Sequence, residues 1–112
     1  RASSRQPVPI KPRKFGDFEV KGTGSGDTVT YWTAKKDRFF IIGHLPGGSV
    51  EAYTKGLKGV KSIGGITCGT NDFGGYECFS QVHGGVGRTT MGPSGTLDEL
   101  AEISRTFYEA WK

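Results

Sequence analysis

The two cysteines are the residues whose type and spacing most directly suggest chemistry. Cys68 and Cys78 are the only cysteines among 112 residues, and they enclose the stretch CGTNDFGGYEC. Two cysteines can form a disulfide, a redox pair or half of a metal site. The nine residues between them match neither the C-x-x-C spacing of a redox pair nor the short spacings of compact zinc sites. Redox chemistry, or a metal site completed by His44 and His83, is therefore the weaker interpretation.

The stretch between the cysteines predicts a hairpin that brings them together. Its Asn, Asp and Gly residues favour a turn over residues 71–75, with a strand on each side. A loop of this length places Thr70 opposite Tyr76, and Cys68 then lies opposite Cys78. Directly opposed residues in antiparallel strands have Cα atoms about 4.5–5.5 Å apart, within disulfide range. We therefore predict a Cys68–Cys78 disulfide, with two reduced cysteines in the core as the alternative.

Residues with catalytic potential show no recognised arrangement. The chain has two histidines and scattered carboxylates, without G-x-S-x-G, H-E-x-x-H or a paired-carboxylate signature. The segment GTGSGD at 22–27 lacks the Lys-Ser/Thr ending of a P-loop, and we interpret it as a hairpin turn. The sequence therefore favours a protein that is not an enzyme and has no cofactor. An enzyme whose catalytic group is assembled from distant residues ranks third among the interpretations.

The positive charge is concentrated at the start of the chain. The formal net charge is +4, and residues 1–14, RASSRQPVPIKPRK, carry five basic residues and no acidic one. The remainder has 10 basic and 11 acidic residues. Because Pro7, Pro9 and Pro12 favour an extended chain, we predict a tail or linker over 1–14 and a single domain over 15–112.

The predicted strands and helices, which must position the cysteines and histidines, occur in the same order in both halves of the chain. Alternating polarity, or β-branched and aromatic content, predicts three strands in each half. Helical spacing of apolar residues predicts one helix after each set, and a T-x-x-E capping box at Thr96 and Glu99 marks the second. The predicted strands are 15–21, 28–34, 39–45, 64–70, 76–82 and 86–91, and the predicted helices are 47–60 and 96–112.

This βββα-βββα order predicts an α+β fold. We expect a two-layer sandwich in which a largely antiparallel sheet of about six strands carries two helices on one face. The stretches at 44–53 and 91–100 occupy equivalent places, which is compatible with an internal duplication. Hydrophobic residues make up 34% of the chain and 19 residues are glycine, as expected of a globular strand-and-turn protein. No apolar run approaches the roughly 18 residues that a membrane helix needs.

Three glycine-rich loops, at 43–48, 70–76 and 83–88, offer residues for binding. Loops held by a rigid sheet are where recognition residues usually lie. Phe73 is the most specific candidate for a contact residue, because it occupies the hairpin tip above the predicted disulfide. The alternative is that its ring folds back on Tyr76. The predicted contact residues for a ligand or partner are Phe73, Tyr76, His83, Arg88 and His44.

Together these features predict a small extracytoplasmic binding domain of bacterial, lipoprotein-like type. A disulfide favours an oxidising compartment, and the expected partner is a protein or a cell-envelope component. A membrane tether upstream of residue 1 is compatible with this interpretation, and the oligomeric state is left open. The alternative is an intracellular regulatory or nucleic-acid-associated protein that uses the basic residues 1–14. Against nucleic acid, the aromatic and basic residues of 31–39 also suit a hairpin whose rings fill the core.

Overall fold

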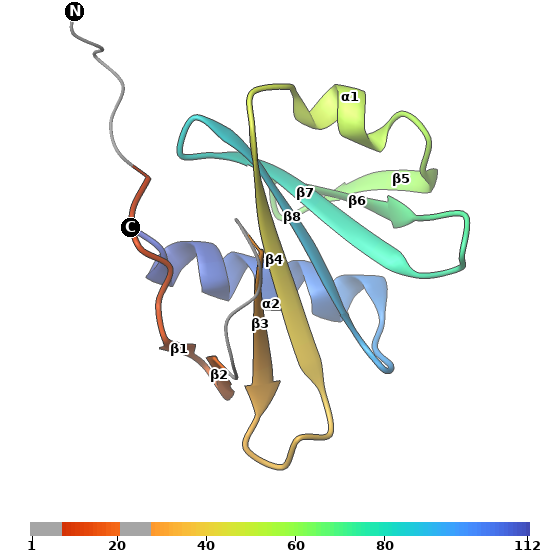
Figure 1. Ribbon diagram of the computed structural model, residues 1–112. Helices are drawn as coiled ribbons and strands as arrows, with labels where there is room; N and C mark the ends of the chain where they lie inside the picture. The colour runs from red at the N-terminus through yellow and green to blue at the C-terminus, as the bar shows by residue number, and fades with distance from the viewer. Residues whose placement is uncertain (1–7, 21–27) are drawn as a thin grey trace, which may run out of the picture.

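Two four-stranded antiparallel meanders join side by side in one sheet (Figure 1). The computed structural model describes residues 8–20 and 28–112 of the chain. Within these ranges the strand order is β1-β2-β3-β4-β8-β7-β6-β5, and the meanders meet where β4 pairs with β8. The strands are β1 (Lys14–Phe15), β2 (Phe18–Val20), β3 (Thr28–Thr33), β4 (Phe39–Pro46), β5 (Lys58–Ile63), β6 (Ile66–Thr70), β7 (Tyr76–Val82) and β8 (Gly85–Gly92), and the helices are α1 (Val50–Thr54) and α2 (Leu97–Ala110).

The α+β class and the antiparallel sheet are confirmed, but the expected count of about six strands is wrong. The described residues form eight strands. The segment predicted as one strand over 15–21 folds back at Gly16, where φ is +54° and glycine is favoured. The second additional strand is β5, which occupies the end of the helix predicted over 47–60. Two glycines in that stretch disfavour helix, and Gly59 has a φ of +59°, so α1 ends at Thr54.

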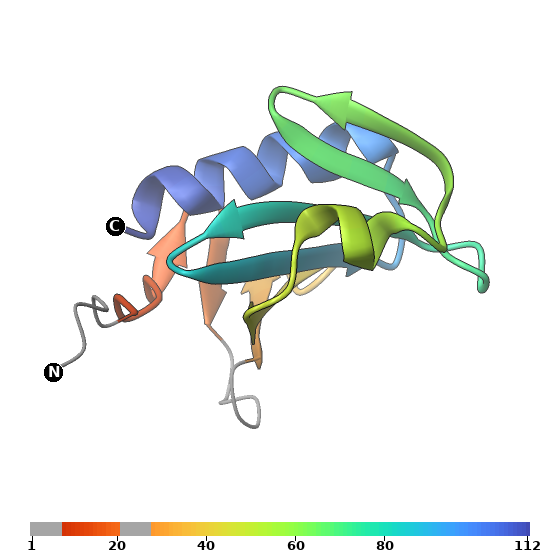
Figure 2. The ribbon, with the colours of Figure 1, turned by 90° about the horizontal axis from the view of Figure 1, so that it is seen from above.

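The two helices lie on opposite faces of the sheet, which corrects the prediction that they share one face (Figure 2). On α2, the Ser104 hydroxyl is 2.7 Å from that of Thr89, which is paired with Cys78. On α1, the ring of Tyr53 stacks on Phe79 at 5.9 Å. Cys78 and Phe79 are successive residues of β7, so their side chains point to opposite faces. We call the α2 side the inner face and the α1 side the outer face.

This arrangement also argues against a symmetric internal duplication. The rotation that superimposes β4 on its antiparallel neighbour β8 has its axis perpendicular to the sheet. Such a rotation would leave both helices on the same face. The opposite placement of α1 and α2 therefore means that the similar order of elements in the two halves is not a two-fold repeat.

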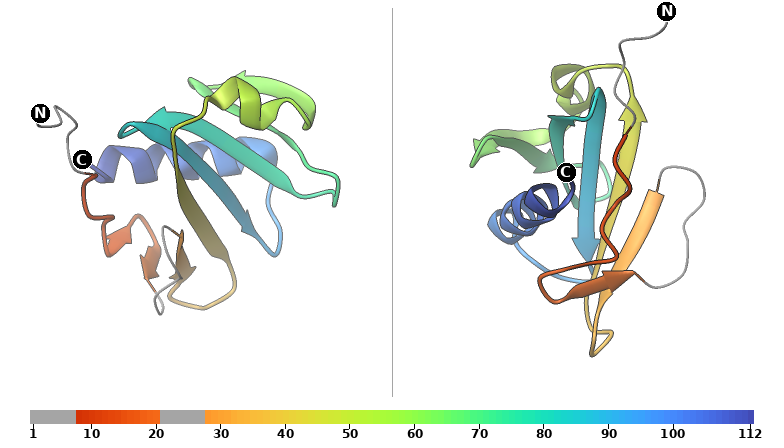
Figure 3. Two further views of the ribbon diagram at one scale, coloured as in Figure 1. Left: turned by 45° about the horizontal axis from the view of Figure 1, so that its top comes forward. Right: turned by 90° about the vertical axis from the view of Figure 1, so that its left-hand side faces the viewer.

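The main core lies between the inner face and α2 (Figure 3, right). The predicted capping box is present: Thr96 Oγ1 accepts from the Glu99 amide at 3.1 Å, and Glu99 Oε1 accepts from the Thr96 amide at 2.8 Å. Neither described helix is long and apolar enough to span a membrane. The buried core residues include Phe15, Phe18, Tyr31, Phe40, Ile42, Cys68, Cys78, Leu100, Phe107 and Trp111.

The described part of the predicted tail, residues 8–14, contacts the domain. Trp111 Nε1 donates to the carbonyl oxygen of Pro9 at 2.7 Å, and the Tyr31 hydroxyl donates to that of Pro12 at 2.6 Å. Burial raises the pKa of Tyr31 to about 12. The Lys11 ammonium lies 5.2 Å from the centre of the Trp111 ring. Residues 1–7, and the turn predicted at 22–27, lie outside the described residues.

Candidate functional site

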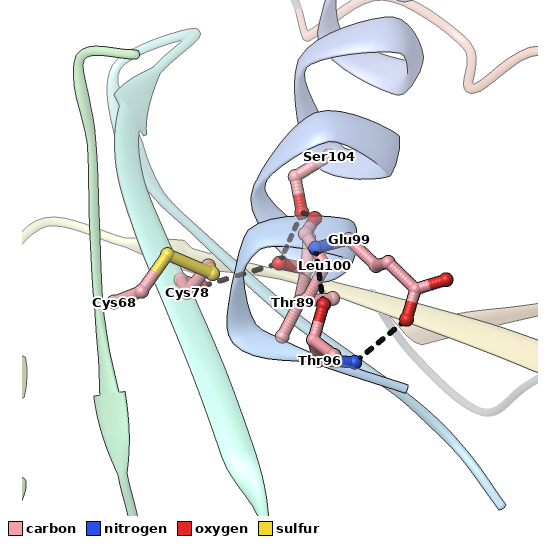
Figure 4. Close-up of a disulfide and its surroundings, with 7 residues drawn as sticks. All are labelled: Cys68, Cys78, Thr89, Thr96, Glu99, Leu100 and Ser104. Carbon is pink, nitrogen blue, oxygen red and sulfur yellow. Dashed lines mark hydrogen bonds between the residues drawn. A yellow bond between two sulfur atoms is a disulfide. The ribbon is translucent and has the colours of Figure 1, made fainter. Parts of the chain in front are cut away.

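The β6–β7 hairpin has the register that the sequence predicts. Thr70 pairs with Tyr76, and Cys68 pairs with Cys78. The two cysteines form a disulfide with an S–S distance of 2.08 Å and a Cα–Cα distance of 4.1 Å. Both are fully buried on the inner face beside the first turns of α2 (Figure 4). The predicted disulfide is therefore confirmed, and it belongs to the core.

The 71–75 loop above the disulfide is closed by its own hydrogen bonds. Asn71 Oδ1 accepts from the amides of Phe73 and Gly75, each at 2.9 Å. The Asn71 amide donates to the carbonyl of Gly75 at 2.8 Å, and the Gly74 amide donates to the carbonyl of Asn71 at 3.1 Å. The sequence interpretation did not single out Asn71, although asparagine commonly bonds to the backbone of its own turn. This side chain gives the loop one defined conformation.

Phe73 extends into solvent from this loop. Its side chain is 97% exposed, so the alternative in which it folds back on Tyr76 is wrong. Tyr76, at the start of β7, is 38% exposed. The ring of Phe73 contacts no other ring in the part of the chain that the structure describes. The loop therefore presents an unpaired aromatic side chain on an ordered backbone.

His44 and His83 lie away from this loop and pack around Trp111. His44 is 7% exposed, and its Nε2 is 2.8 Å from the carbonyl oxygen of Val82. His83 Nε2 is 2.8 Å from the carbonyl oxygen of Trp111. Both imidazole rings meet the Trp111 ring edge-on, at 5.3 and 4.5 Å. Because these rings hold the end of the chain in place, we do not retain them as contact residues.

Arg88 lies on the outer face and is paired with Glu77. Its Nε and Nη2 donate to Glu77 Oε1 and Oε2 at 3.3 and 3.0 Å. Asn71 Nδ2 also donates to Glu77 Oε2, at 2.8 Å. Burial by itself would raise the pKa of Glu77, but these hydrogen bonds and the charge of Arg88 outweigh it and lower the pKa below its ordinary value of 4.5. Glu77 thus links the 71–75 loop to the outer face of the sheet.

Replacing Glu77 with glutamine should make stability less dependent on pH in the acid range. A lowered pKa in the folded state means that ionised Glu77 contributes stability above about pH 4.5, and that this contribution is lost as the pH falls through the folded-state pKa. Glu77→Gln should therefore melt below the wild type at pH 7, with the gap narrowing toward pH 3. Thermal unfolding followed by circular dichroism at each pH measures the melting temperatures of the variant and the wild type. In Glu109→Gln, on the exposed side of α2, the melting temperature should change with pH as it does in the wild type. If the melting temperatures of Glu77→Gln and the wild type differed by the same amount at every pH, the prediction would be contradicted.

The outer face of β3, β4 and β8 carries a groove of about 230 Å³. No described helix covers this part of the sheet, whereas α1 lies over β6 and β7 (Figure 2). Gly43 of β4 forms the floor of the groove. The groove is lined by Thr28, Ile41, Gly43, Leu45, Arg88 and Thr90.

The aromatic and basic stretch at 31–39 does not form an exposed row of stacking rings. Tyr31 is fully buried on the inner face. Trp32 and Phe39, which alternate with inward-facing residues, lie on the outer face with ring centres 5.3 Å apart, and both are partly exposed. Their position places them beyond Ile41 on the same face as the groove.

Two larger hollows, of 320 and 490 Å³, meet around Asp17 and Arg38. Arg38 pairs with Glu99 at 3.4 Å, and the other lining residues carry mixed charge. Among residues 8–20 and 28–112, no three His, Cys, Asp or Glu side chains are grouped so as to hold a metal ion. In particular, Cys68 and Cys78 are bonded to each other.

Comparison with family models, with curated proteins and with solved structures found no match to this chain. Among the described residues, the 71–75 loop presents an exposed aromatic ring and the outer face of the sheet carries a groove over Gly43.

Proposed function

We propose that this chain is a small non-catalytic binding domain of an extracytoplasmic compartment, and that the 71–75 loop is its contact surface. The observation that supports this most directly is the 97% exposure of Phe73 on a loop closed by Asn71. Aromatic side chains are enriched at protein interfaces. Because hydrogen bonds already hold the backbone of this loop, association does not have to order it, which lowers the entropic cost of binding.

The disulfide supports the proposal of an extracytoplasmic compartment. Disulfides persist in oxidising environments and are rare where thiols are kept reduced. Cys68 and Cys78 are directly opposed and fully buried, so the bond fits the hairpin and is shielded from solvent. We propose a protein or a cell-envelope component as the partner, because such molecules share this compartment.

The position of the loop is compatible with a tethered domain. The C-terminus and the described N-terminal segment lie together at one end of the molecule, and the β6–β7 loop lies at the other (Figures 1 and 3). An anchor on the N-terminal side would therefore leave Phe73 directed away from the attachment point.

Replacing Phe73 with alanine should weaken binding at least tenfold while leaving the fold intact. Loss of an interface anchor typically costs more than about 1.4 kcal/mol, which corresponds to tenfold in affinity. The measurement is saturation binding of labelled, oxidised protein to a cell-envelope fraction from the cells that produce it. Protease treatment of that fraction separates a protein partner from another envelope component. The unfolding free energy of Phe73→Ala should stay within about 0.5 kcal/mol of the wild type.

Ile10→Ala is the matched control, since Ile10 is an apolar residue that is 94% exposed and belongs to the N-terminal segment, at the opposite end of the molecule from the loop. It should bind like the wild type. Equal affinities for wild type and Phe73→Ala, or an absence of saturable binding, would show that the 71–75 loop is not the contact surface.

A further inference from the structure

We propose that the groove over Gly43 is a second binding site, which takes one ring of a neutral saccharide. This site uses neither Phe73 nor the 71–75 loop. It is therefore independent of the function proposed above.

Gly43 lies in the middle of β4, where the fold does not require a glycine. Its φ lies outside the positive range that favours glycine, and an added Cβ would meet only Thr28 Oγ1, at an ordinary 3.6 Å. A glycine inside a strand weakens it, and often marks a place where a ligand approaches the backbone closely. Neither backbone strain nor crowding explains why residue 43 is a glycine. We therefore infer that the absent side chain leaves room for a ligand on the strand.

The groove has the dimensions of a ring lying flat on Gly43. Ile41 and Leu45 lie on either side along β4, with Cα atoms about 13–14 Å apart at about 3.4 Å per residue. After their side chains are allowed for, one six-membered ring fits between them. Thr28 and Arg88 are the residues directly opposite Gly43 on the two neighbouring strands. Those strands lie about 4.8 Å to each side, so both side chains reach the edges of such a ring.

The lining combines apolar ends with unused hydrogen-bonding groups. The hydroxyls of Thr28 and Thr90 and Nη1 of Arg88 make no hydrogen bond to any residue that the structure describes. Ile41 and Leu45 offer only C–H groups. A pyranose has C–H groups on its faces and hydroxyls around its edge, and so matches both kinds of surface. Binding sites of this kind pair apolar contact with a few placed polar groups.

Glu77 restricts the occupant to a neutral molecule. Its carboxylate already accepts from Nε and Nη2 of Arg88, so the guanidinium charge in the groove is balanced. A carboxylate or phosphate placed against Nη1 would lie close to Glu77 and be repelled by it. A neutral hydroxyl or carbonyl can accept from Nη1 without that repulsion. This electrostatic balance favours a saccharide over an aromatic acid or a phosphorylated ligand.

Trp32 and Phe39 extend the same face beyond Ile41. Both are partly exposed, and their ring centres are 5.3 Å apart. Their position allows a second ring of an oligosaccharide to pack beside the first. Of the two tryptophans, only Trp32 lies on this face, since Trp111 is buried in the core.

The test is a titration of isotope-labelled protein, followed by NMR, with four neutral trisaccharides and with benzoate. The trisaccharides are those of α-linked glucose, β-linked glucose, mannose and N-acetylglucosamine. At least one should shift the Gly43 amide and the Arg88 Nε–H resonance saturably, and benzoate should not. Gly43→Val fills the floor and should weaken that binding at least tenfold without lowering the melting temperature, because valine suits a strand.

Gly56→Val is the matched control, since an added Cβ at Gly56 meets nothing and the residue is exposed. It should bind the saccharide like the wild type. Phe73→Ala should also keep full saccharide affinity, so that failure of this proposal and failure of the proposed function can be told apart.

Four results would overturn the proposal. The first is that no trisaccharide shifts the groove resonances. The second is that benzoate binds there in preference, which would contradict a neutral occupant. The third is that these resonances shift with protein concentration alone and that Gly43→Val abolishes the effect, which would identify a second copy of the chain as the occupant. The last is wild-type affinity in Gly43→Val, which would place the saccharide elsewhere.

Discussion

Replacing Phe107 with alanine is expected to lower the unfolding free energy by about 3–5 kcal/mol. The Phe107 ring is fully buried between α2 and the inner face. Removing it takes away the apolar contacts and leaves a cavity that the rigid sheet and helix fill only in part. The rings that it contacts are those of Phe15, Tyr31, Phe40, Tyr108 and Trp111.

Phe73→Ala is the matched control, because it deletes the same ring from a position that is 97% exposed. Urea unfolding followed by circular dichroism should show a change within about 0.5 kcal/mol for Phe73→Ala and a large one for Phe107→Ala. If Phe107→Ala does not fold, Phe107→Leu keeps more of the volume and should give an intermediate loss. Similar losses for Phe73→Ala and a Phe107 variant would contradict the burial of the two side chains.

Removing the disulfide should lower the unfolding free energy by about 2–3 kcal/mol. The bond joins residues 10 apart, so its absence enlarges the ensemble of unfolded conformations even though the loop is short. Both cysteines are fully buried against α2, and cysteine-to-alanine changes remove packed sulfur atoms as well. The double variant Cys68→Ala/Cys78→Ala should therefore fold with a lower urea midpoint.

Reductant separates the effect of the bond from that of packing. It should lower the midpoint of the wild type and leave that of the double variant unchanged. Mass spectrometry under native and reducing conditions should show the gain of two hydrogen atoms on reduction. A wild-type midpoint that does not respond to complete reduction would mean that the disulfide contributes nothing to stability.

The hairpin and the second helix could be predicted because their causes are local. Turn residues over 71–75 set the register that brings Cys68 opposite Cys78. Thr96 and Glu99 begin α2 through bonds between residues three apart. Such interactions are fully specified by a short stretch of sequence.

The extent of the first helix could not be predicted from local sequence. Apolar residues recur at helical spacing through 47–60, yet only Val50–Thr54 is helical and Lys58–Ile63 is the edge strand β5. Pairing with β6 competes with helix in that stretch, and its glycines make helix the weaker competitor. Which face α1 covers depends on Phe79, which lies 26 residues further along the chain than Tyr53. A helical spacing contains no information about such a distant contact.

The two proposed binding surfaces could likewise be predicted from the sequence only in part. The sequence by itself determined the disulfide hairpin, the helix α2 and a candidate contact residue at the hairpin tip, because turn chemistry and capping act within a few residues. Only the tertiary structure decided that Phe73 is free in solvent, that His44 and His83 hold Trp111, and that an open groove lies over Gly43. Each of these depends on strands and chain ends that meet from distant parts of the sequence, where burial and pairing are decided by the packed sheet as a whole.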